Sequence, residues 1–114
     1  MALPNVSPRV AASLAKWHAM VESKDLGDIA SIIHPDATFR SPMAFKPYHS
    51  AQAVILLLST VITVFEEFTY HRQLASGDGL SVVLEFSARV GDKKLKGIDL
   101  IQFDADGLIT DFEV

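Results

Sequence analysis

The sequence predicts an α+β fold in which helices cover one face of a mostly antiparallel sheet. In the N-terminal half, apolar residues recur at helical spacing, whereas in the C-terminal half they alternate with polar residues. The segments "SGDG", "GD" and "DADG" divide this alternating half and suit tight hairpins. Helices followed by a run of antiparallel strands favour a helical layer on one side of a sheet. We expect one domain over residues 1–114.

Two helices are predicted before the first strand. Ser7 is a typical N-cap, and Pro8 begins a helix whose apolar stripe continues to about Lys24. Asp25 can cap a short second helix. This helix should end near His34, because the proline that follows disfavours helical backbone at that position.

The middle of the chain carries a short strand and a third helix. The segment "DATFRS" is predicted to be a strand that Pro42 stops, and "FKPY" is predicted to be a short edge strand or a loop. Ser50 can cap a third helix that reaches Phe65. Because "AVILLLSTVITVF" is apolar on nearly every side, we expect this helix to be largely buried.

The C-terminal half is predicted to form four strands, over residues 67–76, 80–91, 93–104 and 108–114. Apolar side chains on alternate positions give these strands one face toward the core. Val83, Ile98 and Leu100 point to the opposite face, where a monomer would leave them together in water. We therefore expect a homodimer through the outer face of the sheet.

Asp99 lies in the middle of the more apolar face of its strand, next to Ile101 and Phe103. No lysine or arginine shares that strand face, so burial should raise the pKa of the carboxyl group. The cations able to reach it from other strands are Arg40, Arg72 and Arg89. A buried carboxyl group can mark a functional site, or it can be a structural hydrogen-bonding group, and both alternatives stay open here.

Composition excludes several classes of function. Of 114 residues, 49% are hydrophobic and 21% charged, and the formal net charge is −4, which argues against nucleic acid or an anionic membrane as partner. The chain has no cysteine, so disulfides, thiolate nucleophiles and cysteine-type zinc sites are excluded. The start "MALPNVSPRV" has neither a basic segment nor an apolar core of a signal peptide, and cytoplasmic location is the default expectation. No cofactor motif of the P-loop or G-x-G-x-x-G type is present.

Three stretches together resemble the nuclear transport factor 2-like superfamily, in its SnoaL-like and ketosteroid-isomerase-like branch. They are "KWHAMVESKDLGDIASIIHPDATFRSP", "AVILL" and "KGIDLIQFDADGLITDFEV". The resemblance implies a cystatin-like cone: a strongly curved sheet closed by three helices around a hydrophobic pocket. It also implies a homodimer through the sheet. Chains of this kind usually continue past the last strand, where this sequence stops at Val114.

The resemblance also implies positions for catalysis. The isomerase branch carries a tyrosine on the first helix, an aspartate before the proline that ends the first strand, and an aspartate in a late strand. Trp17, Ser41 and Asp99 stand at these positions here, and only Asp99 keeps its type. Ser41 lacks the pKa of a general base, and the Trp17 N–H cannot replace an acidic phenol. Ketosteroid isomerisation of the usual kind is therefore not expected.

Histidines supply two further candidates for proton transfer. His18 lies near the edge of the first helix's buried stripe, and His71 lies in a strand, although a strand histidine more often faces solvent. No pair of histidines and carboxylates has metal-ligand spacing, so no metal site is predicted. The candidate catalytic residues are Asp99, His71 and His18, and the predicted pocket-lining residues are Trp17, Met20, Ser41, Phe45, Tyr70, Phe86, Ile101 and Phe103.

Three functions remain open on the sequence. The first is a module that binds a small hydrophobic molecule in the pocket. The second is a cofactor-independent isomerase, lyase or polyketide-cyclase-type enzyme that uses Asp99 as acid or base on a carbonyl compound. The third is a dimeric scaffold whose pocket is vestigial. The loss of a carboxylate at Ser41 favours the first and third over the second.

Overall fold

The computed structural model describes residues 6–41 and 46–114. Its elements are two α-helices, a short 3₁₀ helix and six strands: α1 (Pro8–Ser23), η1 (Ile29–Ile32), β1 (Ile33–Arg40), β2 (Tyr48–His49), α2 (Ala51–Val64), β3 (Glu66–Ala75), β4 (Ser81–Val90), β5 (Lys93–Phe103) and β6 (Ile109–Glu113). The predicted α+β class is confirmed. The predicted three helices are in fact two α-helices and the 3₁₀ turn.

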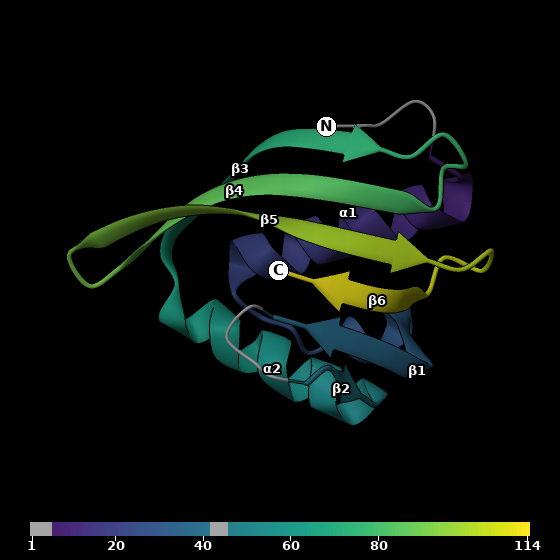
Figure 1. Cartoon of the computed structure of the whole chain (residues 1–114), viewed down its shortest axis with the longest axis horizontal. Coiled ribbons are helices and arrows are strands. Elements are labelled where there is room, and N and C mark those ends of the chain that lie inside the picture. Colours follow the sequence, from purple (N-terminus) through teal and green to yellow (C-terminus); the bar gives the residue numbers. More distant parts are fainter. Residues whose placement is uncertain (1–5, 42–45) are drawn as a thin grey trace.

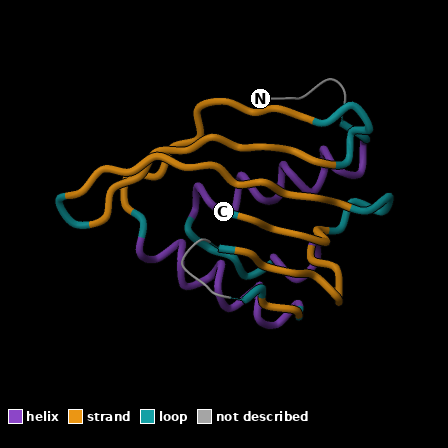
Figure 2. The backbone as a smooth tube through the Cα atoms, in the orientation of Figure 1, coloured by secondary structure: helices purple, strands orange, loops and turns teal. Residues whose placement is uncertain are grey.

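The six strands form one curved sheet in the order β2-β1-β6-β5-β4-β3. Every neighbouring pair is antiparallel except β1 and β6, which are parallel. In Figure 1, α1 crosses behind the strands and α2 lies below them, beside β1 and β2. Figure 2 shows how β3, β4 and β5 curl along their length, with the β4–β5 hairpin reaching beyond the helices. The helices and the curved sheet thus enclose the core on one side of the sheet.

Helix α1 begins and ends where the sequence predicts. The Ser7 side chain accepts a hydrogen bond from the Val10 N–H at 3.3 Å, and Pro8 occupies the first turn. Lys24 is the C-cap in the left-handed region, at φ 58°, and its N–H bonds to the carbonyl oxygens of Met20 and Val21. The predicted stripe is buried against the sheet.

The second predicted helix is wrong for most of its length. Only residues 29–32 form a 3₁₀ helix, and β1 begins at Ile33 and runs through His34 and Pro35. Pro35 is tolerated because the β1–β6 register is irregular between Ile33 and Thr38, where a missing N–H costs no ladder hydrogen bond. Pro35 thus lies within the strand, and Pro42, which was predicted to stop it, lies outside the described residues.

Helix α2 is capped as predicted but is not largely buried. Ser50 accepts a hydrogen bond from the Ala53 N–H at 3.0 Å. The helix buries one face alone, whose members are Val54, Leu58 and Ile62, and Leu56 on the opposite side is 67% exposed. The reason is that the sheet lies on one side of the helix only. In the described part of the chain, neither α-helix has the length and hydropathy needed to cross a bilayer.

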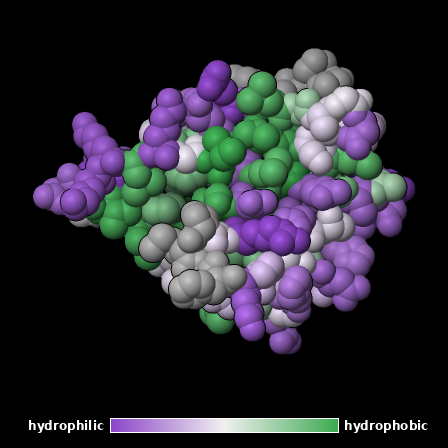
Figure 3. Space-filling view, viewed as in Figure 1, coloured by the Kyte–Doolittle hydropathy of each residue, from purple (hydrophilic) through white to green (hydrophobic). Residues whose placement is uncertain are grey.

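The two faces of the sheet differ as the alternation predicts. The inner face of β4 and β5 buries Val82, Leu84, Phe86, Ala88, Ile101 and Phe103. The outer face is the one seen in Figure 3, where hydrophobic side chains gather over β3–β5. Leu74, Ile98 and Leu100 are exposed there by 54%, 49% and 40%.

Candidate functional site

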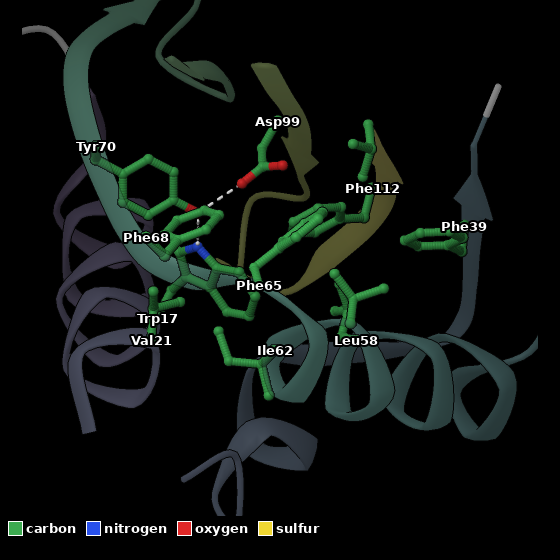
Figure 4. A pocket seen from close by; sticks show the side chains of 12 residues that line it. Trp17, Val21, Phe39, Leu58, Ile62, Phe65, Phe68, Tyr70, Asp99 and Phe112 are labelled. Carbon is green, nitrogen blue, oxygen red and sulfur yellow. Dashed lines mark hydrogen bonds between the residues drawn. The ribbon is translucent and has the colours of Figure 1, made fainter. Parts of the chain in front are cut away.

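The inner face of the sheet, α1 and α2 surround a small apolar cavity (Figure 4). Its walls are Trp17, Val21, Phe39, Leu58, Val61, Ile62, Phe65, Phe68, Tyr70, Asp99, Phe112 and Val114. The cavity has a volume of about 30 Å³, which is room for a water molecule or two. Asp99 carries the only charged side chain among the described residues that line it. A few polar groups on an otherwise apolar wall are typical of sites that orient a small molecule.

Three polar groups from three elements form a hydrogen-bond chain in this cavity. The Tyr70 hydroxyl, on β3, donates to Asp99 Oδ2 on β5 at 2.5 Å. The Trp17 Nε1–H, on α1, donates to the Tyr70 oxygen at 3.0 Å. Figure 4 shows the three side chains converging from the helix and the two strands. The chain fixes the direction of the phenol proton, because the Tyr70 oxygen accepts from Trp17 and so donates toward Asp99.

Burial dominates the protonation of Asp99. The side chain is buried among apolar residues, with 5% of its surface exposed. Burial raises the pKa of Asp99 to about 7, although the hydrogen bond from Tyr70 opposes the rise. Burial and the Asp99 carboxylate raise the pKa of Tyr70 as well, so the phenol stays protonated. The burial of Asp99 thus supplies the physical cause of the raised pKa that the sequence predicts.

No cation reaches Asp99 within the described chain. Tyr70 is its only hydrogen-bond partner among the described residues. The three arginines able to approach it pair elsewhere: Arg40 with Asp111 at 3.0 Å, Arg72 with Glu85 at 2.7 Å and Arg89 with Glu66 at 2.8 Å. The carboxyl group thus lacks the ion pair that would hold it ionised.

The two candidate histidines lie outside the cavity. His18 packs the edge of its ring against Tyr70, with centroids 5.2 Å apart, and burial lowers its pKa while a hydrogen bond to Gln73 opposes the change. His71 is exposed, and its Nε2 lies 2.7 Å from Ser87 Oγ. Tyr70 and His71 point to opposite faces of β3, so the structure does not bring His71 together with Asp99. The exposure of His71 agrees with the expectation that a strand histidine more often faces solvent.

The remaining predicted pocket residues divide into three groups. Trp17 and Tyr70 line the cavity, as predicted. Buried residues of the surrounding core, which do not line it, are Met20, Phe86, Ile101 and Phe103. Ser41 is half-buried at the end of β1, also away from the cavity, and Phe45 lies outside the described residues.

Sequence reasoning missed the aromatic residues that close the cavity. Phe65 follows the end of α2, and Phe68 follows an irregular start of β3. Phe68 stacks on Phe86 with centroids 4.8 Å apart, and its edge meets Tyr70 at 4.9 Å. Phe39 and Phe112 form the opposite wall. For Phe39 and Phe112, the alternation of apolar residues along β1 and β6 was the available sequence signal that they point inward.

The cavity offers one titratable hydrogen-bond donor and acceptor on an apolar wall. When protonated, Asp99 can donate a hydrogen bond to a ligand oxygen, and when ionised it can accept a proton. The two forms coexist near neutral pH because the pKa lies at about 7. Among the described residues, no three histidine and carboxylate side chains are grouped as metal ligands would be. The arrangement therefore suits recognition of a polar group on an otherwise apolar molecule.

Comparison with known proteins identifies the family. Residues 14–112 match the family described as the SnoaL-like domain. The chain belongs to this family. Its place in the nuclear transport factor 2-like superfamily, predicted from three sequence stretches, is confirmed. No protein of curated function matches this SnoaL-like chain.

Solved structures similar to this SnoaL-like chain include two above 30% identity. A steroid delta-isomerase from Pseudomonas aeruginosa is 60% identical, with a TM-score of 0.95 over 98% of this chain and 81% of its own. An uncharacterised protein with a cystatin-like fold from Silicibacter pomeroyi DSS-3 is 31% identical, with a TM-score of 0.83 over 96% and 74%. SalBIII, an epoxide hydrolase/cyclase-like enzyme, shares the fold at 17% identity, with a TM-score of 0.75 over 92% and 88%.

Proposed function

We propose that the cavity binds a small, uncharged hydrophobic molecule and that protonated Asp99 donates a hydrogen bond to an oxygen of that molecule. The observation that carries the proposal is a buried carboxyl group, with a pKa of about 7, on the wall of an otherwise apolar cavity. A buried acid without a cationic partner costs stability when it ionises, and such groups cluster at functional sites.

The chemistry of the cavity favours a neutral carbonyl compound over a charged one. An anionic ligand would meet the Asp99 carboxyl group without a cation to balance it, and a cation would lose its hydration among aromatic rings. A ketone oxygen needs only a donor, which the protonated acid supplies. Tyr70 fixes one oxygen of the acid and leaves the other for the ligand.

Paired probes test this proposal through the fluorescence of Trp17, the single tryptophan of the chain. We expect decalone, a bicyclic ketone, to bind about tenfold more tightly than decalin, the hydrocarbon of the same shape, well below the pKa of Asp99. The preference should shrink as the pH rises through about 7, because ionised Asp99 no longer donates. Asp99→Asn keeps a donor, so its preference for the ketone should not depend on pH.

The control for the binding test is His71→Ala, because His71 lies on the outer face and should not change the preference. Equal affinity for ketone and hydrocarbon would contradict the role of Asp99. Failure of both probes to bind would favour the dimeric scaffold with a vestigial pocket, an alternative that the small cavity volume supports.

A second candidate function is proton transfer on a steroid-like ketone, which is favoured by the 60% identity to a protein named steroid delta-isomerase. Ionised Asp99 would remove a proton from the carbon between a carbonyl and a double bond and return it at the far end of the double bond. The product is the conjugated ketone, which absorbs in the ultraviolet. Turnover that Asp99→Asn abolishes and His71→Ala preserves would favour this enzyme, whereas binding without turnover would favour the binding module.

A further inference from the structure

We propose that the junction between α2 and β3, residues 65–68, is the gate of the cavity, and that Arg89 on β4 is the latch that keeps it closed. The inference rests on the proposed ligand binding, because a cavity of about 30 Å³ must open before it admits an organic molecule. Two of its aromatic walls, Phe65 and Phe68, come from this junction, and both are partly buried rather than fully enclosed. Phe65 and Phe68 are only three residues apart in the chain, so a small change in the backbone of the junction would move both rings.

The gate contains an unfavourable backbone conformation. Glu67 has φ 53°, in the left-handed region that residues other than glycine seldom adopt. The β3–β4 register shifts between Glu66 and Thr69, which marks a bulge. Such a conformation persists only where surrounding contacts hold it. The gate therefore needs a side chain that holds it in this conformation. Loss of that contact would let the backbone relax to a more favourable conformation.

The bulge decides which way the gate's side chains point. Glu66 and Phe68 are two residues apart and would share a face of a regular strand. Here they lie on opposite faces: Glu66 pairs with Arg89 on the outer face, and Phe68 lines the cavity. Loss of the bulge would therefore turn either the ion pair or the phenyl ring away from its present position.

Arg89 contacts two consecutive residues of the gate. Its guanidinium lies 2.8 Å from Glu66 Oε2 and 3.5 Å from Glu67 Oε1, and it also donates to the Gly91 carbonyl oxygen at 2.6 Å. One side chain thus ties the two residues before Phe68 to the end of β4. The Arg89 side chain is 31% exposed, so these ion pairs weaken as salt screens them.

The gate is also connected to the polar end of the cavity. Phe68 stacks on Phe86 and meets the ring of Tyr70, whose hydroxyl binds Asp99. Movement of Phe68 would uncover Tyr70 and, behind it, Trp17. Trp17 is 4% exposed with the gate closed, and it is therefore a reporter for opening.

Acrylamide quenching of Trp17 tests the latch without any ligand. We expect Arg89→Ala to raise the quenching rate constant by about two- to fivefold, the range that the loss of one or two partly exposed ion pairs implies. The double variant Glu66→Gln/Glu67→Gln, which removes the same pairs without shortening a side chain, should give the same rise. Added salt should increase quenching in the native protein and have little effect in Arg89→Ala.

Arg72→Ala is the matched control, because it removes an ion pair between the same two strands, Arg72 with Glu85 at 2.7 Å, away from the gate. It should leave quenching unchanged. Unchanged quenching in both latch variants, or an equal rise in Arg72→Ala, would overturn the proposal. The quenching experiment uses no ligand, so its result does not depend on whether ketones bind. The gate proposal and the binding proposal can therefore be refuted independently.

Discussion

At the scale of single residues, Asp99 is predicted to make stability depend on pH. Its pKa is about 7 in the folded protein and about 3.9 in the unfolded chain, so the folded state holds the proton longer. The free energy of unfolding should therefore decrease as the pH rises from about 4 to about 7. Asp99 alone contributes a slope of up to about 1.4 kcal/mol per pH unit. Urea unfolding across this range measures the slope.

Asp99→Asn should remove that part of the pH dependence and stabilise the fold near neutral pH. The difference in stability between the two proteins isolates the contribution of Asp99. Other carboxyl groups have pKa values shifted in the opposite direction, such as Glu85, whose pKa the Arg72 ion pair lowers. An NMR titration of the Asp99 carboxyl group gives a direct check. A midpoint at or below about 3.9 would mean a charged, paired aspartate and would contradict the assignment.

Residue-level inference from the sequence succeeded where alternation held and failed where the chain departs from regular strands. Asp99 was placed inward because β5 alternates without interruption from Leu95 to Phe103. The exposure of His71 agrees with the expectation that a strand histidine faces solvent, whereas the register shifts of β3 on both sides of Thr69 and Tyr70 were not predicted. The sequence carries no marker for these shifts, since the left-handed residue is Glu67 and not a glycine.

At the scale of elements, the turn between β5 and β6 is predicted to depend on Gly107. This residue has φ 82°, and an added Cβ would lie 2.6 Å from the Arg9 carbonyl oxygen at the start of α1. The Ser13 hydroxyl also donates to the Gly107 carbonyl oxygen at 2.5 Å. We expect Gly107→Ala to destabilise the protein by about 2–4 kcal/mol, from an unfavourable φ and a backbone clash together.

Gly91→Ala is the control for that prediction. Gly91 has a similar φ of 62°, but an added Cβ there would meet nothing within 4 Å. It should therefore cost about 1–2 kcal/mol, the contribution of the backbone conformation alone. Thermal or urea unfolding measures both changes, and equal losses in the two variants would show that the close approach to Arg9 costs nothing.

Elements with strong local signals were predicted well, and those decided by distant contacts were not. Ser7 and Ser50 cap α1 and α2 as predicted, because capping is a local hydrogen bond. The start of β1 at Ile33 depends on parallel pairing with β6, near the other end of the sequence, which no local pattern indicates. The exposure of α2 likewise depends on where the sheet lies.

At the scale of the whole molecule, we propose a homodimer through the outer face of β3–β5. Val83 pairs with both Leu74 and Leu100 across the strands, and Ile98 lies two residues from Leu100, so the exposed apolar side chains are contiguous. Ile98→Lys/Leu100→Lys should produce a monomer in sedimentation experiments, whereas Leu56→Lys on α2 should not. A native protein that sediments as a monomer at micromolar concentration would contradict the proposal.

The position of β6 has a consequence for how the chain acquires its structure. This strand is the last in the sequence, yet it lies in the interior of the sheet between β1 and β5. During synthesis, β1 and β5 therefore have no shared neighbour until β6 leaves the ribosome, and their unpaired edges stay open to other nascent chains. The β1–β6 pairing should form later than the local β3–β4 and β4–β5 hairpins, since it closes a loop of most of the chain.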